Sequence, residues 1–267
     1  VVEFSASSTF LNSFVDAYGG SITEHDALSN FLLGSERGRE KPDESDIHTP
    51  NILSDTLLQK ATSTQKILGD WGAPRGVEVT QIIGWGLDTI KGLRYYEGTE
   101  SGCGGFTLAP TCWERPVFAH ELLITTDGDE TVVVPSAAAM ENEKKFYIDL
   151  PAYNTEKVLR RFTNRDREHG DIFEVNAVRE LIAQVVKNSV NDNTLPRYTT
   201  AVKPEADDDD KRLRVRVHSP VSVDVYDLFG NHTGTMLADI DGRDVEILEE
   251  QIPNSYYWTV GEEKYVG

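Results

Sequence analysis

Positive charge, cysteine and long apolar runs are all scarce in this sequence of 267 residues. It has 26 lysines and arginines against 45 aspartates and glutamates, which gives a formal net charge of −19. A chain this acidic lacks the clustered positive charge that nucleic acids and anionic headgroups attract, so we expect no nucleic-acid partner. It also lacks any run of about 18 apolar residues, so we expect no transmembrane segment. Hydrophobic residues still make up 39% of the chain, enough for a globular core.

The only two cysteines, Cys103 and Cys112, lie together in the stretch SGCGGFTLAPTC. Two thiols in one short loop predict a disulfide bond, and a disulfide indicates an oxidising compartment, extracellular or in the cell envelope. The alternative is a pair of free thiols. The spacing C-x-x-C is absent, so we expect neither a zinc site nor any other metal or cofactor.

The pattern of apolar residues predicts an α/β fold followed by a small all-β domain. Residues 1–190 form the α/β part, in which residues 1–70 are mostly helical and resemble a cap or lid. Strands are predicted at GVEVTQIIGWG, ERPVFAHELLITT and KFYIDLP, and the clearest helix at DIFEVNAVRELIAQVVKNS. Residues 191–211 are an acidic linker with four consecutive aspartates, and residues 212–267 alternate like a small β-sandwich.

Two residues in separate loops suggest hydrolytic chemistry. Asp129 lies in TTDGDETVVVPS, and His169 lies in NRDREHGDIFEV, just before the predicted helix. Acyl transfer through a nucleophilic residue needs a base and a carboxylate that orients the base. In α/β hydrolases the acid precedes the histidine along the chain, and this order is present here. Asp127, in the same loop, is a rival for the role of the acid.

These segments resemble the C-terminal half of the lecithin:cholesterol acyltransferase-like α/β hydrolases, over roughly residues 50–190. The resemblance rests on GVEVTQIIGWGLDTIKGLRYY, on DGDETVVVPSAAA and on EHGDIFEVNAVRELI, in this order. It implies a partial α/β-hydrolase sheet, with Asp129 as the triad acid and His169 as the general base. It also implies a serine esterase, lipase or O-acyltransferase that acts on lipid-like esters.

The nucleophile of that family is missing from the sequence. No Gly-x-Ser-x-Gly motif exists, because the glycines near Ser35 and Ser101 are in the wrong register and Ser136 has no flanking glycines. We therefore expect the serine, together with the N-terminal half of the hydrolase domain, to lie upstream of Val1. The alternative is a non-catalytic secreted or cell-surface binding protein on a hydrolase scaffold.

The loop between the cysteines is the expected contact with lipid. Phe106 and Leu108 lie within it and Trp113 directly follows it, and loops of this kind border acyl pockets. For the bonded cysteines we expect a Cα–Cα distance of about 4.4–6.8 Å. His232 lies in strand-like alternation and is expected to be half-exposed and without function. The acidic turn at 127–130 is expected to be solvated rather than a calcium site.

Overall fold

The computed structural model describes residues 1–5, 11–36, 39, 52–104, 111–140, 143–156, 166–206, 212–218, 221–240, 242–261 and 263–267. The chain divides into two compact units. The first comprises Val1–Gly72 with Lys91–Ile124, and the second comprises Ala73–Ile90 with Thr125–Gly267. Within the described part of the chain, no helix is long and apolar enough to cross a membrane.

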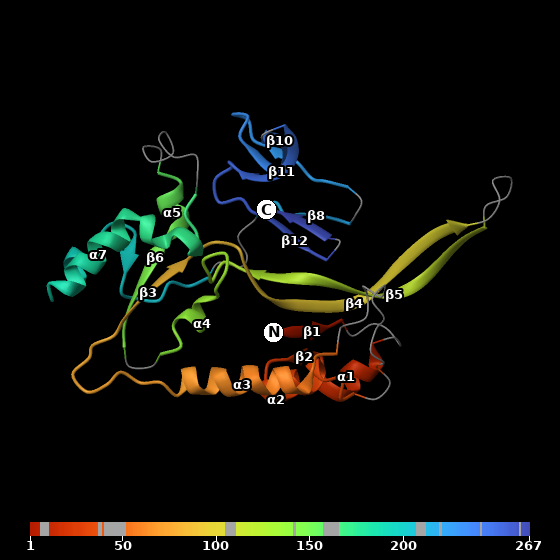
Figure 1. The fold of residues 1–267 in the computed structure, drawn as a ribbon, viewed down its shortest axis with the longest axis horizontal. Helices are drawn as coiled ribbons and strands as arrows, with labels where there is room; N and C mark the ends of the chain where they lie inside the picture. The colour runs from red at the N-terminus through yellow and green to blue at the C-terminus, as the bar shows by residue number, and fades with distance from the viewer. Residues whose placement is uncertain are drawn as a thin grey trace. The chain divides into compact units, whose positions relative to one another are not determined.

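The described residues of the first unit form a mixed four-stranded sheet and the helices α1, α2 and α3 (Figure 1). The strand order is β2-β1-β4-β5, in which β1 runs parallel to β4 and antiparallel to β2. The elements are β1 (Val2–Phe4), α1 (Asn12–Tyr18), β2 (Ser21–Ile22), α2 (His25–Leu32), α3 (Asp55–Gly69), β4 (Thr89–Gly104) and β5 (Thr111–Thr125).

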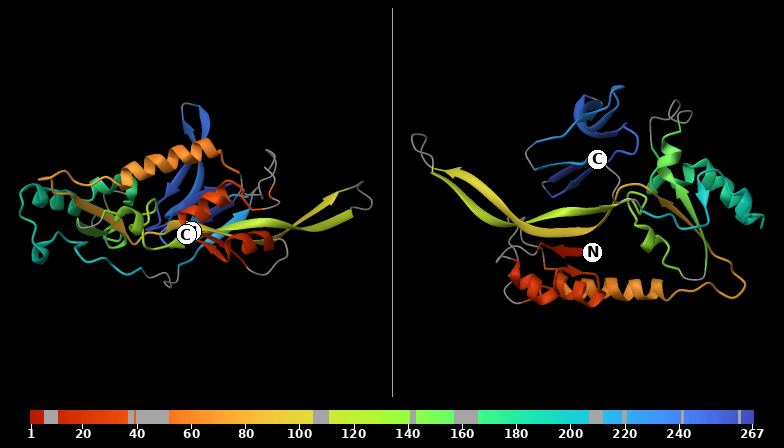
Figure 2. Two further views of the ribbon diagram at one scale, coloured as in Figure 1. Left: turned by 90° about the horizontal axis from the view of Figure 1, so that it is seen from below. Right: turned by 180° about the vertical axis from the view of Figure 1, so that it is seen from behind.

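An aromatic cluster forms the core of the first unit. Phe4, Phe14, Phe31, Tyr95 and Phe118 come from five different elements, and all are at most 9% exposed. The Tyr95 and Phe118 ring centroids are 4.8 Å apart, and those of Phe4 and Phe14 are 5.5 Å apart. Full burial of a phenylalanine contributes about 1.5–3 kcal/mol, so these rings contribute strongly to holding β1, α1 and α2 on the β4–β5 hairpin. The two long strands of that hairpin run side by side in both views of Figure 2.

The second unit contains three three-stranded sheets, with orders β3-β6-β7, β12-β13-β8 and β11-β10-β9. Its first part has β3 (Thr80–Trp85), α4 (Val134–Ala137), β6 (Lys144–Asp149), α5 (Leu150–Asn154), the 3-10 helix η1 (His169–Glu174), α7 (Asn176–Val186), the 3-10 helix η2 (Asp192–Thr194) and β7 (Thr199–Thr200). The described elements that follow are all strands: β8 (Val215–His218), β9 (Val225–Tyr226), β10 (His232–Ile240), β11 (Arg243–Glu250), β12 (Tyr257–Val260) and β13 (Glu263–Val266).

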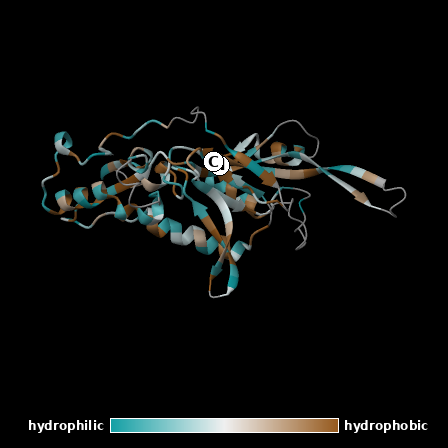
Figure 3. Cartoon of the chain, turned by 90° about the horizontal axis from the view of Figure 1, so that it is seen from above, coloured by the Kyte–Doolittle hydropathy of each residue, from teal (hydrophilic) through white to brown (hydrophobic). Residues whose placement is uncertain are grey.

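Helix α7 packs on the β3–β6 pair through one apolar face. Val178 and Leu181 are at most 1% exposed and contact Ile148 and Leu150 in the same core cluster. Brown and teal residues alternate along the helix in Figure 3, as the amphipathic pattern predicts. The helix predicted in this segment therefore forms, and the 3-10 helix η1 precedes it.

The predicted α/β-hydrolase sheet is wrong. β3 and β6 are parallel, but β7 joins them antiparallel, and the remaining described sheets of this unit are small and antiparallel. Residues 1–70, predicted as a helical cap, also contribute β1 and β2 to the mixed sheet of the first unit. The stretch GLRYYEGTESGCG is polar and rich in glycine, so its extended conformation in β4 has no strong sequence signal.

Candidate active site

Asp129 lies in a tight loop that follows β5. Its backbone pairs with Leu87, directly after β3, and its N–H donates to the Val132 carbonyl at 3.3 Å. Two glycines permit this close packing. A Cβ on Gly84 would lie 2.9 Å from the Asp129 Cβ, and one on Gly128 would lie 2.3 Å from the hydroxyl of Thr89. The glycines therefore allow the loop to bring Asp129 against the end of β3.

Asp129 as a whole residue is 4% exposed, and both oxygens of its carboxylate have hydrogen-bond partners. Its Oδ1 accepts hydrogen bonds from the backbone N–H of Val132 at 2.8 Å and of Thr131 at 3.3 Å. Its Oδ2 lies 2.8 Å from Nδ1 of His169. A buried carboxylate is stabilised in its charged form by such donors, so Asp129 is equipped to orient and polarise the imidazole.

His169 begins η1 and contacts the Asp129 loop twice. Its backbone N–H donates to the Asp129 carbonyl at 3.1 Å, in addition to the contact of its side chain. The carboxylate accepts only, so Nδ1 carries the hydrogen and Nε2 of the neutral ring is an acceptor. The side chain of His169 is 49% exposed, whereas the side chain of Asp129 is 6% exposed. The predicted proximity of the two side chains is thus confirmed, and 40 residues of chain separate them.

No described residue forms a hydrogen bond with Nε2 of His169. Ser136, the serine nearest to Asp129 along the chain, lies inside the short helix α4, and its N–H donates to the Val133 carbonyl. Within the described residues, the Asp129–His169 pair therefore has no hydroxyl nucleophile bonded to it.

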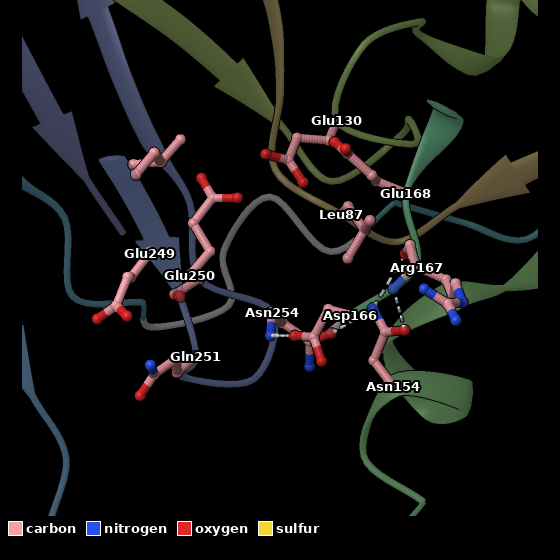
Figure 4. A pocket seen from close by; sticks show the side chains of 12 residues that line it. Leu87, Glu130, Asn154, Asp166, Arg167, Glu168, Glu249, Glu250, Gln251 and Asn254 are labelled. Carbon is pink, nitrogen blue, oxygen red and sulfur yellow. Dashed lines mark hydrogen bonds between the residues drawn. The ribbon is translucent and has the colours of Figure 1, made fainter. Parts of the chain in front are cut away.

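An acidic cavity of about 470 Å³ lies beside the pair. Glu130 and Glu168, the sequence neighbours of Asp129 and His169, lie on one side of it, and Glu249 and Glu250 lie opposite (Figure 4). Burial and the negative charges of Glu168 and Glu250 raise the pKa of Glu130 to about 8. Five carboxylates and one guanidinium line the cavity: Glu130, Asp166, Glu168, Glu249, Glu250 and Arg167. Its charge disfavours an anionic ligand at neutral pH.

His232, expected to be half-exposed, is buried with 6% exposure. Its Nδ1 lies 2.9 Å from Glu249 and its Nε2 lies 3.0 Å from Asp224, while Tyr226 stacks on the ring at 4.6 Å. The hydrogen bonds to these carboxylates raise the pKa of His232. The expectation was wrong because the partners come from two other segments, around β9 and in β11, which period-two alternation cannot indicate.

The disulfide between Cys103 and Cys112 is confirmed, and its Cα–Cα distance of 4.0 Å is shorter than the expected range. Phe106 and Leu108, the predicted lipid contacts, lie outside the described residues. Trp113 is described and is 43% exposed, with the Arg115 guanidinium 5.2 Å from its ring centroid. Trp113 belongs to the first unit and the Asp129–His169 pair to the second, so its substrate-binding role stays a prediction.

Sequence reasoning missed two asparagines that hold the segment before His169. Asn154 ends α5 and contacts Arg167, and it also contacts Asn254 in the loop before β12. These contacts span 13 and 100 residues of chain, and no local pattern indicates them.

Comparison with family models, curated proteins and solved structures found no match to this chain. The resemblance to lecithin:cholesterol acyltransferase-like hydrolases therefore rests on short motifs alone.

Proposed function

We propose that this chain supplies the triad acid and the general base of a serine esterase, lipase or O-acyltransferase of lipid-like esters. The observation that carries the proposal is the 2.8 Å contact between Asp129 Oδ2 and His169 Nδ1. The carboxylate is buried and held by backbone donors, whereas the imidazole is half-exposed. A general base needs this arrangement, in which a carboxylate orients one imidazole nitrogen and the ring stays accessible to a reacting group.

The proposed chemistry follows from the protonation states. Nε2 of His169 takes the proton of the attacking hydroxyl while that oxygen bonds to the ester carbonyl carbon. The imidazolium that forms is stabilised by the Asp129 carboxylate, which itself stays deprotonated. When the carbon–oxygen bond to the leaving alcohol breaks, Nε2 returns the proton to that oxygen. Water or an acceptor alcohol repeats the sequence on the acyl-enzyme.

The nucleophile in this proposal comes from outside the 267 residues. The sequence contains no Gly-x-Ser-x-Gly motif, and no described serine is hydrogen-bonded to His169. The disulfide supports an extracellular or cell-envelope location, because such bonds persist in oxidising compartments.

Fluorophosphonate labelling tests the proposal on the protein expressed from its complete gene in its native source, so that any further segment or partner is retained. We expect one serine outside these 267 residues to react. Its labelling rate should fall by several orders of magnitude in His169→Ala, because loss of the triad histidine lowers kcat by about 10⁶-fold in a serine protease. His25→Ala removes another exposed histidine and should leave the rate unchanged. Labelling that is unaffected by His169→Ala would overturn the proposal.

The missing nucleophile favours a second candidate, a non-catalytic secreted or cell-surface binding protein. The acidic cavity would then be the binding site, with a neutral or cationic ligand. Complete absence of labelling in the native protein would favour this candidate and would exclude the serine enzyme.

A further inference from the structure

The buried side chain of Asn154 forms two hydrogen bonds with the segment that precedes His169. It is 4% exposed and lies at the last position of α5. Its Oδ1 accepts from the Arg167 backbone N–H at 2.9 Å, and its Nδ2 donates to the carbonyl of the same residue at 3.1 Å. One amide thus binds both backbone groups of Arg167, as a neighbouring strand would.

The orientation of the Asn154 amide follows from the backbone. The N–H of Arg167 can only donate, so the oxygen of the amide must face it, and the Arg167 carbonyl must face the nitrogen. The second hydrogen of Nδ2 is used as well, because Nδ2 lies 3.2 Å from Oδ1 of Asn254. Both amide hydrogens therefore have acceptors, and the side chain has one preferred orientation.

Asn254 completes this anchor from the loop before β12. It has a positive φ of 56°, a conformation that asparagine tolerates better than most residues. Its backbone N–H donates to a carboxylate oxygen of Asp166, one residue before Arg167. The segment around Arg167 is consequently held by the side-chain amide of Asn154, from α5, and by the backbone N–H of Asn254, from the loop that joins β11 to β12.

This anchor is only two residues from the proposed base. Beyond Arg167, the N–H of Glu168 donates to Asp171 at 2.9 Å, and the N–H of His169 donates to the Asp129 carbonyl. The backbone N–H groups of Arg167, Glu168 and His169 therefore all have acceptors, and these hydrogen bonds run without a gap from the anchor to the proposed base. We infer that Asn154 is a positioning residue that holds His169 against Asp129. The inference rests on the proposed function for its catalytic meaning, but the contact itself can be measured without turnover.

The test measures how fast the Nδ1 hydrogen of His169 exchanges with water, by NMR of the ¹⁵N-histidine-labelled chain. The resonance is assigned by its loss in His169→Gln. Asn154→Ala should accelerate the exchange by at least about tenfold, because the segment opens more often once the amide is lost. Asn154→Asp keeps an acceptor for the Arg167 N–H but repels the carbonyl, so its exchange rate should be intermediate. Val178→Ala, in the buried face of α7, is the control for general destabilisation and should stay within about twofold of the wild type.

A rate in Asn154→Ala within twofold of the wild type would overturn the inference, as would an equal acceleration in Val178→Ala. If Asn154→Ala does not fold, Asn254→Gly decides together with Asn154→Asp. The glycine keeps the positive-φ backbone and removes only the acceptor of Nδ2. Both variants should exchange faster than Val178→Ala, and equal rates would refute the positioning role. Failure of fluorophosphonate labelling would instead count against the proposed enzyme and leave this result unchanged.

Discussion

Asp129→Asn should abolish catalysis by reversing the tautomer of His169. In the wild type, Asp129 accepts from three donors: the N–H groups of Val132 and Thr131 on one oxygen and Nδ1 of His169 on the other. Asparagine has a single acceptor oxygen. If this oxygen faces the two N–H groups, the amide NH₂ faces Nδ1, which must then accept, so the hydrogen moves to Nε2.

The opposite amide orientation is disfavoured by the same geometry. It would place NH₂ against two buried N–H donors, each of which costs about 1–3 kcal/mol when it is left unsatisfied. At about 1.4 kcal/mol per tenfold, the Nε2–H tautomer should dominate by more than tenfold. An imidazole with hydrogen on Nε2 cannot take the proton of a nucleophile, and the same substitution in a serine protease triad lowers kcat by about 10⁴.

Two measurements check this prediction. The ¹⁵N shifts of His169 in the chain report which nitrogen carries the hydrogen, and fluorophosphonate labelling of the complete native protein reports the loss of rate. Asp127→Asn is the matched control, because this rival acid contacts Lys203 at 3.1 Å rather than the histidine. An Nδ1–H tautomer that persists in Asp129→Asn, with a labelling rate within tenfold of the wild type, would refute the reasoning.

Three further predictions concern stability. The pKa of His232 is raised in the folded state, so its stabilisation is complete below the unfolded value of about 6.5 and is lost as the pH rises through the folded pKa. The urea midpoint should fall over that range, and His232→Gln should remove this dependence. The pKa of Glu130 is 4.5 in the unfolded state and about 8 in the folded state. Between these two values Glu130 ionises mainly in the unfolded state, so the fold loses stability as the pH rises above 4.5. Glu130→Gln should therefore have a higher urea midpoint than the wild type at pH 8.5, with the difference shrinking toward pH 4.5; equal midpoints at pH 8.5 would contradict this. Replacing Cys103 and Cys112 by serine should lower the free energy of unfolding by about 2–3 kcal/mol, as expected for closure of a ring of about ten residues. Thiol titration of the denatured, unreduced wild type should find no free thiol.

Local pattern was sufficient for several elements of the second unit. The β-branched run before Gly86 forms β3, and the amphipathic segment ahead of Lys187 forms α7. The proximity of Asp129 to His169 was predicted from the resemblance to acyltransferase-like hydrolases, in which the acid precedes the histidine along the chain. The hydrolase sheet was not predictable in the same way. That sheet was inferred from short sequence motifs, and the same short motif can occur in folds that have different sheets.

The sequence by itself determined the disulfide and the amphipathic helix, since each depends on residue chemistry and short-range periodicity. Only the tertiary structure decided that β1 pairs with β4, that His232 is enclosed by Glu249 and Asp224, and that Asn154 holds Arg167. The physical reason is that these contacts join segments distant along the chain through single polar side chains or backbone hydrogen bonds. Every residue has such backbone groups, so pairing between distant segments leaves no periodic signal in the sequence.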